Sequence, residues 1–530
     1  MLDKMSPNQR LIVAVLLSVI FFVAYTAIFP PVEPVVDDTK VKTAVKSNIA
    51  QQSESVNVEA EAGHIISESQ KSSSSNLVTV TSKNFILKID TLGRISSKEL
   101  LQEKFRDKED RHAQLIPTNG TKPLYIRFMD EELNKEAIKV AYTASVDELN
   151  LDGSAKSVTL TQKLSSLTVN KKITFFEDGH YDVAISLSQD KRYYVYLGQR
   201  PRVNEEEQMM TVVGAMVYTN DEIVTIIEDG DAEGRKSFSG VELISAFDQY
   251  TATIMYELGK DRTVFVERDL EDNPVVYFDG MQNINFSGYI GQKNYKTLKS
   301  INPVLTNAIE YGWFTFAAKP LFALLSWLHS IFGNWGWAII ALTAIIRFVL
   351  YPLTYKGMVS MQKMKDLAPK IKDLKEKYKG DPQRLNQATM DMYKKNGANP
   401  LGGCLPMLMQ IPVFFAIYRV LLNAVELQGA PWILWINDLS RMDPYYIMPI
   451  LMGASMFLQQ RMTPNNFTDP MQEKVMKWLP VIFTFFFVTF PSGLVLYWFV
   501  NNLFSILQQF IVNQQFKNAK DAIKAAKVEK

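Results

Sequence analysis

Runs of uncharged, mostly apolar residues constrain this 530-residue chain more than any other feature of its sequence. The first run covers residues 11–29, and a helix rising about 1.5 Å per residue over that length crosses a hydrocarbon core of about 30 Å. Together with it, five later runs predict six membrane crossings, and these lie at 334–355, 402–424, 444–460, 478–490 and 494–515. An even number of crossings places both chain ends on the same side.

Three of these assignments have an alternative. Residues 11–29 read best as an uncleaved anchor, because the apolar part of a cleaved signal peptide normally has about 7 to 15 residues and no clean small-x-small site follows. The runs 444–460 and 478–490 are short against the roughly 20 residues that a crossing needs. Either the bilayer is locally thin around them or their boundaries are misplaced by a few residues.

The region between the first crossing and the others is polar. Residues 30–75 carry scattered acids, Gln and Ser without periodicity and are predicted to be a flexible linker. Residues 76–300 alternate with period two, as in Tyr181/Val183/Ile185, and carry turn signals that include Phe278-Asp-Gly280. This pattern predicts a large antiparallel β-sandwich. The single cysteine, Cys404, excludes an intramolecular disulfide, so the sandwich must be held by its own core.

Lysine and arginine counts orient the chain, because cytoplasmic loops hold the excess. Residues 1–10, 356–400, 461–477 and 516–530 contain two, eleven, three and five of them, whereas 425–443 contains only one. The N-terminal tail, the segment 356–400, the loop 461–477 and the basic tail 516–530 are therefore predicted to be cytoplasmic. The sandwich and the loop 425–443 then lie in the periplasm, and 301–333 reads as an amphipathic segment at the membrane surface.

Enzyme chemistry has little support in the sequence. No histidine occurs after His329, and the chain lacks GxxxxGK[ST], GxSxG and HExxH motifs. We expect no catalytic residue, metal or cofactor. A net charge of +1 argues against a DNA-binding protein.

Arg347 is the most unusual residue of the predicted crossings. It lies ten residues after Trp337 and nine before Lys356, close to the middle of its crossing. The ordinary explanation is an arginine that reaches a headgroup, but the distance makes full escape difficult. No Asp or Glu occurs in any crossing to neutralise it. A hydrated groove is therefore favoured over a dry packed network.

Other polar residues repeat at helical spacing and could face the same groove. Thr343 precedes Arg347 by four residues, and Gln410 lies in the third crossing. The last crossing carries its own stripe at i, i+4, i+8 and i+11, namely Tyr497, Asn501, Ser505 and Gln508. The alternative is that these stripes only supply hydrogen bonds between helices.

The cytoplasmic segment 356–400 is predicted to be an antiparallel helical hairpin that turns at Gly380-Asp-Pro382. Its apolar stripe includes Met361, Met364 and Leu367. These side chains either fill the hairpin core or contact varied apolar partners, since thioethers adapt to many surfaces. The basic tail 516–530 either touches anionic lipid or contacts ribosomal RNA.

Several segments resemble one known family. They are RFVLYPLT at 347–354, NPLGGCLPMLMQIPVF at 399–414, DPYYIMPILMG at 443–453 and FPSGLVLY at 490–497. All are similar to the YidC membrane protein insertases of Gram-negative bacteria. The resemblance implies a periplasmic β-supersandwich and a five-helix core around a groove in which Arg347 matches the family's arginine. Trp498 stands where the family often has another aromatic residue, usually Tyr, that contacts substrate.

The predicted function is insertion and folding of nascent inner-membrane proteins, whose transmembrane segments pass from the cytosol through the groove into the lipid bilayer. The resemblance implies that the protein works alone or beside the Sec translocon. The alternative is a secondary transporter or channel that binds an anion at Arg347. Such a protein would normally show paired repeats, and this sequence has none.

Overall fold

The computed structural model describes residues 75–105, 111–203, 211–259, 261–309, 315–398, 400–462 and 470–528. The chain divides into two compact units, Met1–Ile309 and Glu310–Lys530, and each is treated by itself. The predicted anchor 11–29 and all but the last residue of the linker 30–75 lie outside the described residues.

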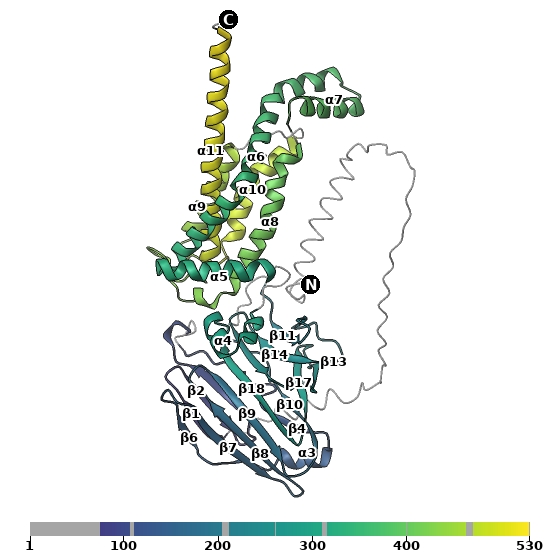
Figure 1. Ribbon diagram of the computed structural model, residues 1–530, viewed down its shortest axis with the longest axis vertical. Helices are drawn as coiled ribbons and strands as arrows, with labels where there is room; N and C mark the ends of the chain where they lie inside the picture. Colours follow the sequence, from purple (N-terminus) through teal and green to yellow (C-terminus); the bar gives the residue numbers. More distant parts are fainter. Residues whose placement is uncertain are drawn as a thin grey trace, which may run out of the picture. The chain divides into compact units, whose positions relative to one another are not determined.

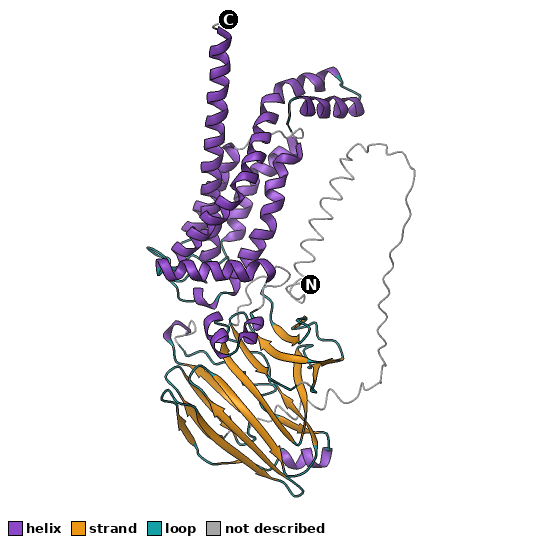
Figure 2. Ribbon diagram, viewed as in Figure 1, coloured by secondary structure: helices purple, strands orange, loops and turns teal. Residues whose placement is uncertain are grey.

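The first unit is a β-sandwich of three sheets (Figure 2). The four-stranded sheet has the order β3-β2-β1-β6, with the bounds Ile95–Leu100, Phe85–Asp90, Asn76–Thr81 and Glu148–Asn150. The five-stranded sheet has the order β13-β16-β17-β10-β4, with the bounds Arg235–Ser239, Thr263–Arg268, Pro274–Met281, Arg192–Tyr196 and Ile126–Phe128. The nine-stranded sheet has the order β12-β11-β14-β15-β18-β9-β8-β7-β5, with the bounds Val224–Glu228, Gly214–Thr219, Val241–Phe247, Thr251–Tyr256, Asn283–Gln292, His180–Leu187, Thr168–Phe175, Lys156–Lys163 and Thr143–Ala144.

Alternation of apolar and polar residues builds this sandwich, as the sequence predicted. In β9 the side chains of Tyr181, Val183 and Ile185 are buried, while Asp182 and Ala184 between them are exposed. Successive strand residues point to opposite faces, so one face of each strand supplies the core. Strand pairing is antiparallel in most of the sandwich, but β1 and β6 pair in parallel.

The predicted turn at Phe278-Asp-Gly280 was wrong, because all three residues lie inside β17. Gly280 pairs with Tyr193 of β10. A Cβ atom at Gly280 would lie 2.7 Å from the Tyr193 ring, so glycine here makes room for an aromatic side chain.

Two fully buried lysines tie the four-stranded and nine-stranded sheets together. Lys98 of β3 donates from Nζ to the carbonyl oxygens of Gly179 (3.3 Å) and Ile290 (2.5 Å), both in the nine-stranded part. Lys171 of β8 donates in the opposite direction, to Gly93 O (2.7 Å) and Leu124 O (2.8 Å). Burial lowers the pKa of each lysine to about 7.

The sandwich unit ends in short helices that belong to its core. Helix α4 (Tyr295–Ile301) follows β18 directly, and the 3-10 helix η3 (Pro303–Ala308) packs against β14 and β15. Leu298, Leu305 and Ala308 are fully buried. The domain therefore extends to about residue 309 rather than to 300. The remaining short helices, η2 and α3, cover Glu103–Phe105 and Glu131–Ala137.

The second unit is helical. Its helices are α5 (Thr315–Phe332), α6 (Trp335–Lys377), α7 (Pro382–Lys395), α8 (Pro400–Asn423), η5 (Val425–Leu427), α9 (Ile447–Met462), α10 (Pro470–Phe487) and α11 (Ser492–Val528). Figure 1 shows α6, α8, α9, α10 and α11 side by side, with α5 lying across one end of them. Helix α5 contacts α6 and α8.

Several helices exceed the predicted crossings. Helix α6 is 43 residues long and joins the crossing 334–355 to the first arm of the predicted hairpin. Helix α10 begins at Pro470 and ends at Phe487, so it starts before the predicted run 478–490, but its apolar stretch stays short. Helix α11 continues through most of the basic tail 516–530. Sequence hydropathy marks only the apolar part of a helix, and these helices continue where their side chains become charged.

Length and composition suit three helical stretches of the described chain for crossing a membrane: α5, α6 and residues 492–518 of α11. Apolar stretches at 410–423 of α8 and 477–487 of α10 are shorter. Helix α9 has 16 residues and spans about 24 Å at about 1.5 Å per residue.

Candidate functional site

Arg347 on α6 is 7% exposed and is held by α11. Its Nε donates to Asn501 Oδ1 (2.7 Å), and its Nη2 donates to the Asn501 carbonyl oxygen (3.0 Å) and to Ser505 Oγ (2.6 Å). All three acceptors are uncharged. The predicted stripe on the last crossing therefore meets Arg347 directly.

Gln410 of α8 joins the same network. Its Nε2 donates to Asn501 Oδ1 at 3.2 Å, so this oxygen accepts from both Arg347 and Gln410. Three helices thus converge on one asparagine. Because amide O and N positions follow from such bonds, the Asn501 carboxamide must present its oxygen to both donors.

These residues line a small recess between α6, α8 and α11, to which Tyr497 and Val413 also contribute. The recess leaves about 10 Å³ for the centres of water molecules. This volume is room for about one water. In this conformation the arginine lies in a nearly closed network.

Two predicted residues do not point toward Arg347. Thr343 is buried, but its Oγ1 donates to Ile339 O of its own helix at 2.7 Å, a bond that threonine commonly makes inside helices. Trp498 instead packs against Phe414 of α8 and Phe487 of α10, with ring centroids 4.6 and 4.9 Å away.

Trp498 belongs to an aromatic cluster that spans α8, α10 and α11. Its other members, joined to it directly or through one another, are Phe414, Phe415, Tyr418, Phe483, Phe486, Phe487 and Phe490. Phe486 is exposed, and Phe485 beside it is 83% exposed. The cluster therefore offers an apolar surface next to the polar recess.

The sequence analysis missed a second polar contact on α11. Asn502 donates from Nδ2 to Ser455 Oγ of α9 at 3.0 Å and is buried. Gln508 continues the Arg347 side of α11, and its Oε1 is buried without a hydrogen-bond partner. Adjacent helical residues differ by about 100° in direction, so Asn501 and Asn502 serve different neighbours.

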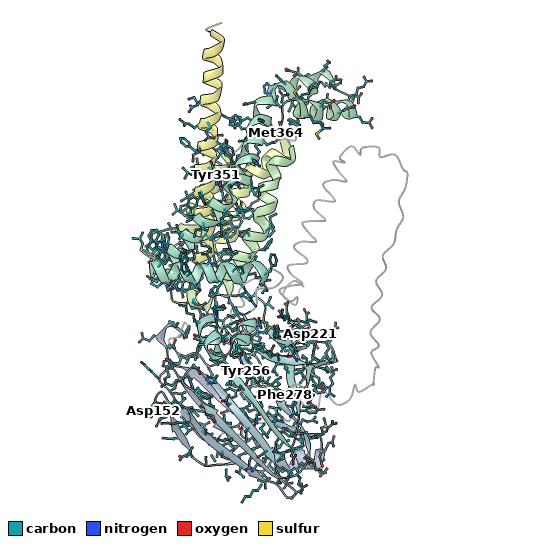
Figure 3. All side chains as sticks on the ribbon, in the orientation of Figure 1. Asp152, Asp221, Tyr256, Phe278, Tyr351 and Met364 are labelled. Carbon is teal, nitrogen blue, oxygen red and sulfur yellow. The ribbon has the colours of Figure 1, made fainter. Side chains whose placement is uncertain are left out.

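The predicted hairpin residues lie on the long arm of α6. Figure 3 shows Tyr351 within the bundle and Met364 farther along α6 toward α7. Leu367 is 6% exposed, whereas Met361 and Met364 are half-buried. The chain turns at Gly380, whose φ is +102°, and Asp381 Oδ1 caps α7 by accepting from Arg384 N.

A β-sandwich joined to a bundle of apolar helices around a hydrogen-bonded arginine defines a class: multi-pass membrane proteins with a large domain outside the membrane. Comparison with known proteins narrows this class. Residues 77–324 match the family model of the YidC periplasmic domain, and residues 327–520 match that of the 60Kd inner membrane protein.

Close relatives cover the whole chain. The membrane protein insertase YidC of Wolinella succinogenes is 46% identical over 99% of this chain and 98% of its own length. That of Campylobacter jejuni is 47% identical over 96% of each chain. The crystal structure of YidC from Thermotoga maritima is 16% identical with a TM-score of 0.29, covering 82% of this chain and 99% of that chain.

This chain belongs to the YidC family of membrane protein insertases. It is an insertase of the inner membrane rather than an enzyme, and it acts on membrane proteins in contact with lipid. The predicted family and the predicted insertase function are confirmed. The transporter or channel alternative has no support among the relatives.

Proposed function

We propose that the recess at Arg347 receives the hydrophilic segment of a substrate during insertion. A buried guanidinium whose partners are all neutral is the observation that carries this proposal. Such a group binds a carboxylate more strongly than it binds an amide or hydroxyl. An acidic residue that leaves the cytosol would thus find a partner midway and lose less free energy on desolvation.

Neighbouring polar groups extend this path. Hydrogen-bonding groups around Arg347 come from Asn501, Ser505, Gln410 and Tyr497. Thr343 lies on α6, as Arg347 does, and bonds to the backbone of that helix. Gln508 Oε1 lacks a partner and would accept a hydrogen bond from a backbone N–H of a passing segment. Together these groups lower the barrier for polar chain without binding any one sequence tightly.

The apolar part of the substrate would move beside the aromatic cluster around Trp498 and then into lipid. Burial of apolar surface stabilises the inserted state by about 25 cal/mol per Å². A helix of about 20 apolar residues therefore supplies the driving force, and nucleotide hydrolysis is not needed.

The placement in the membrane follows from charge. The N-terminal tail 1–10, the hairpin 356–400, the loop 461–477 and the tail 516–530 lie in the cytosol, and the sandwich lies in the periplasm. Helix α5, with Trp327 57% exposed, rests at the periplasmic surface of the inner membrane.

The partners follow the same geometry. The half-buried Met361 and Met364 of the hairpin contact arriving substrates, while the buried Leu367 fills the hairpin core. The basic tail contacts ribosomal RNA or anionic lipid, since lysines neutralise phosphate in either. Small substrates are inserted by this protein alone, and larger ones beside the Sec translocon.

The test is insertion of a small single-spanning substrate with an acidic translocated segment into liposomes that contain the purified protein. Protection from added protease reports insertion. Arg347→Ala should lower the protected fraction severalfold, and Arg347→Lys should retain much more of it because the charge remains. Equal loss for both variants would show that guanidinium geometry matters and charge alone does not suffice.

Two controls define the result. Empty liposomes give the background, and Arg441→Ala removes an arginine that is 60% exposed and bonded to Asp438 outside the recess. If Arg347→Ala inserts the substrate as well as wild type while folding and orientation are verified, the recess is not the polar path.

A further inference from the structure

The small volume of the recess raises the question of how a polypeptide enters it. Room for about one water is far too small for a peptide segment. Helix α8 must therefore separate from α11, or their side chains must rearrange, before a substrate can reach Arg347.

Asn501 is where the closing contacts meet. Its Oδ1 accepts from Arg347 of α6 and from Gln410 of α8, so one carboxamide joins α11 to two helices. The α8 backbone approaches α11 at few positions, whereas α6 packs closely along both. The hydrogen bond from Gln410 to Asn501 thus joins α8 and α11, the two recess helices that have the least backbone packing between them.

We propose that Asn501 is a latch that keeps the recess shut until an acidic group of the substrate competes for Arg347. The inference rests on the proposed function and adds how entry of the substrate into the recess is controlled. A carboxylate is a stronger acceptor than an amide for Arg347 Nε and Nη2 and can take both together. Asn501 must rotate away to admit it, and the seam between α8 and α11 then loses its hydrogen bond to Gln410.

This latch makes entry selective. A neutral segment has no group that outcompetes Asn501 for the guanidinium, so it opens the recess less readily. Acidic residues in the translocated segment would speed opening as well as stabilise the segment once it is inside.

Opening can be measured without insertion. Val413 of α8 lines the recess and is half-buried, so Val413→Cys in a Cys404→Ser background reports access by its rate of reaction with a water-soluble maleimide. Asn501→Ala and Gln410→Ala should each raise this rate severalfold. Asn502→Ala should leave it unchanged.

Asn502 is a matched control because it is the neighbouring buried asparagine and bonds to Ser455 on α9 instead. If Asn501→Ala and Asn502→Ala change the rate equally, or neither changes it, Asn501 is not a latch. Gln410→Ala carries the same test if Asn501→Ala fails to fold.

A second variant strengthens the latch. Asn501→Asp is nearly isosteric and places a carboxylate on Arg347, which should slow labelling of Val413→Cys and impair insertion of an acidic substrate severalfold. A substrate with a neutral translocated segment should be affected less. Wild-type labelling and insertion in Asn501→Asp would overturn the proposal.

The two proposals fail differently. If Arg347→Ala inserts normally, the polar path itself is wrong. If Arg347→Ala is impaired but labelling of Val413→Cys is unchanged by Asn501→Ala and by Gln410→Ala, the path stands and only the latch is wrong.

Discussion

Replacing Lys98 by methionine should change how the stability of the β-sandwich depends on pH. The ordinary lysine pKa of 10.5 falls to about 7 for Lys98, because burial disfavours the ammonium and Asp178 offsets only part of this. Lys171 behaves alike. Between about pH 7 and pH 10.5, the folded and unfolded pKa values of each lysine, the unfolded lysine holds a proton that the folded one has lost. Unfolding then takes up a proton, and stability rises with pH.

The size of the effect follows from the shift. Each such lysine adds about 1.4 kcal/mol of stability per pH unit in this window, or about 3 kcal/mol from pH 7.5 to 9.5. The two lysines together give about twice that. The rise of stability with pH ends near pH 10. Burial raises the pKa of Tyr142 and Tyr289 above that of unfolded tyrosine, so unfolding there releases protons and stability falls.

Pulse proteolysis in urea of the full chain in detergent, at pH 7.5 and 9.5, measures the free energy of unfolding of the sandwich. Lys98→Met should lose about 3 kcal/mol of the pH-dependent gain, and the rest stays with Lys171 and with Lys122, whose pKa burial lowers to about 8. Lys163→Met removes an exposed lysine of β7 and controls for lysine loss alone. An undiminished gain in Lys98→Met would refute the view that this lysine is deprotonated in the fold.

Three further substitutions probe the helical unit. Gly453→Ala should lower the thermal stability of the bundle, because a Cβ atom there would collide with Thr484 Oγ1, which already donates to Pro480 O. An unchanged melting temperature in detergent would contradict this close packing. Leu367→Ser should destabilise the hairpin by about 2 kcal/mol or more, and Met361→Ser by less since its side chain is half-buried. Limited proteolysis between α6 and α7 distinguishes the two, and equal cleavage would show that burial of Leu367 is unimportant.

Helical periodicity predicted which polar residues of α11 contact Arg347. Resemblance to a family alone did not predict the contacts of Trp498. Asn501 and Ser505 share the Tyr497 face because they follow at four-residue spacing, and both reach Arg347. Trp498 was placed in the groove by resemblance, but one residue along a helix turns the side chain by about 100°. It therefore faces the aromatic cluster.

Other features depend on contacts between distant residues and are not visible in local patterns. Alternation predicted strands, but the parallel pairing of β1 with β6 joins segments about 70 residues apart. In the sequence Gly280 resembles a turn residue, and only the packing of the Tyr193 ring against it shows why glycine stands inside a strand. The shared acceptor at Asn501 likewise requires three helices to meet, and their packing is not encoded in any one of them.

The unbroken course of α6 connects the hairpin arm directly to the recess. Pro352 lies five residues beyond Arg347 and removes one backbone hydrogen bond, so bending is concentrated beside the recess. Leu367 lies 15 residues farther, about 22 Å along the helix. A bend of about 5° at Pro352 would move Leu367 by about 2 Å, so small changes of the α6 angle at the recess become larger displacements of the hairpin.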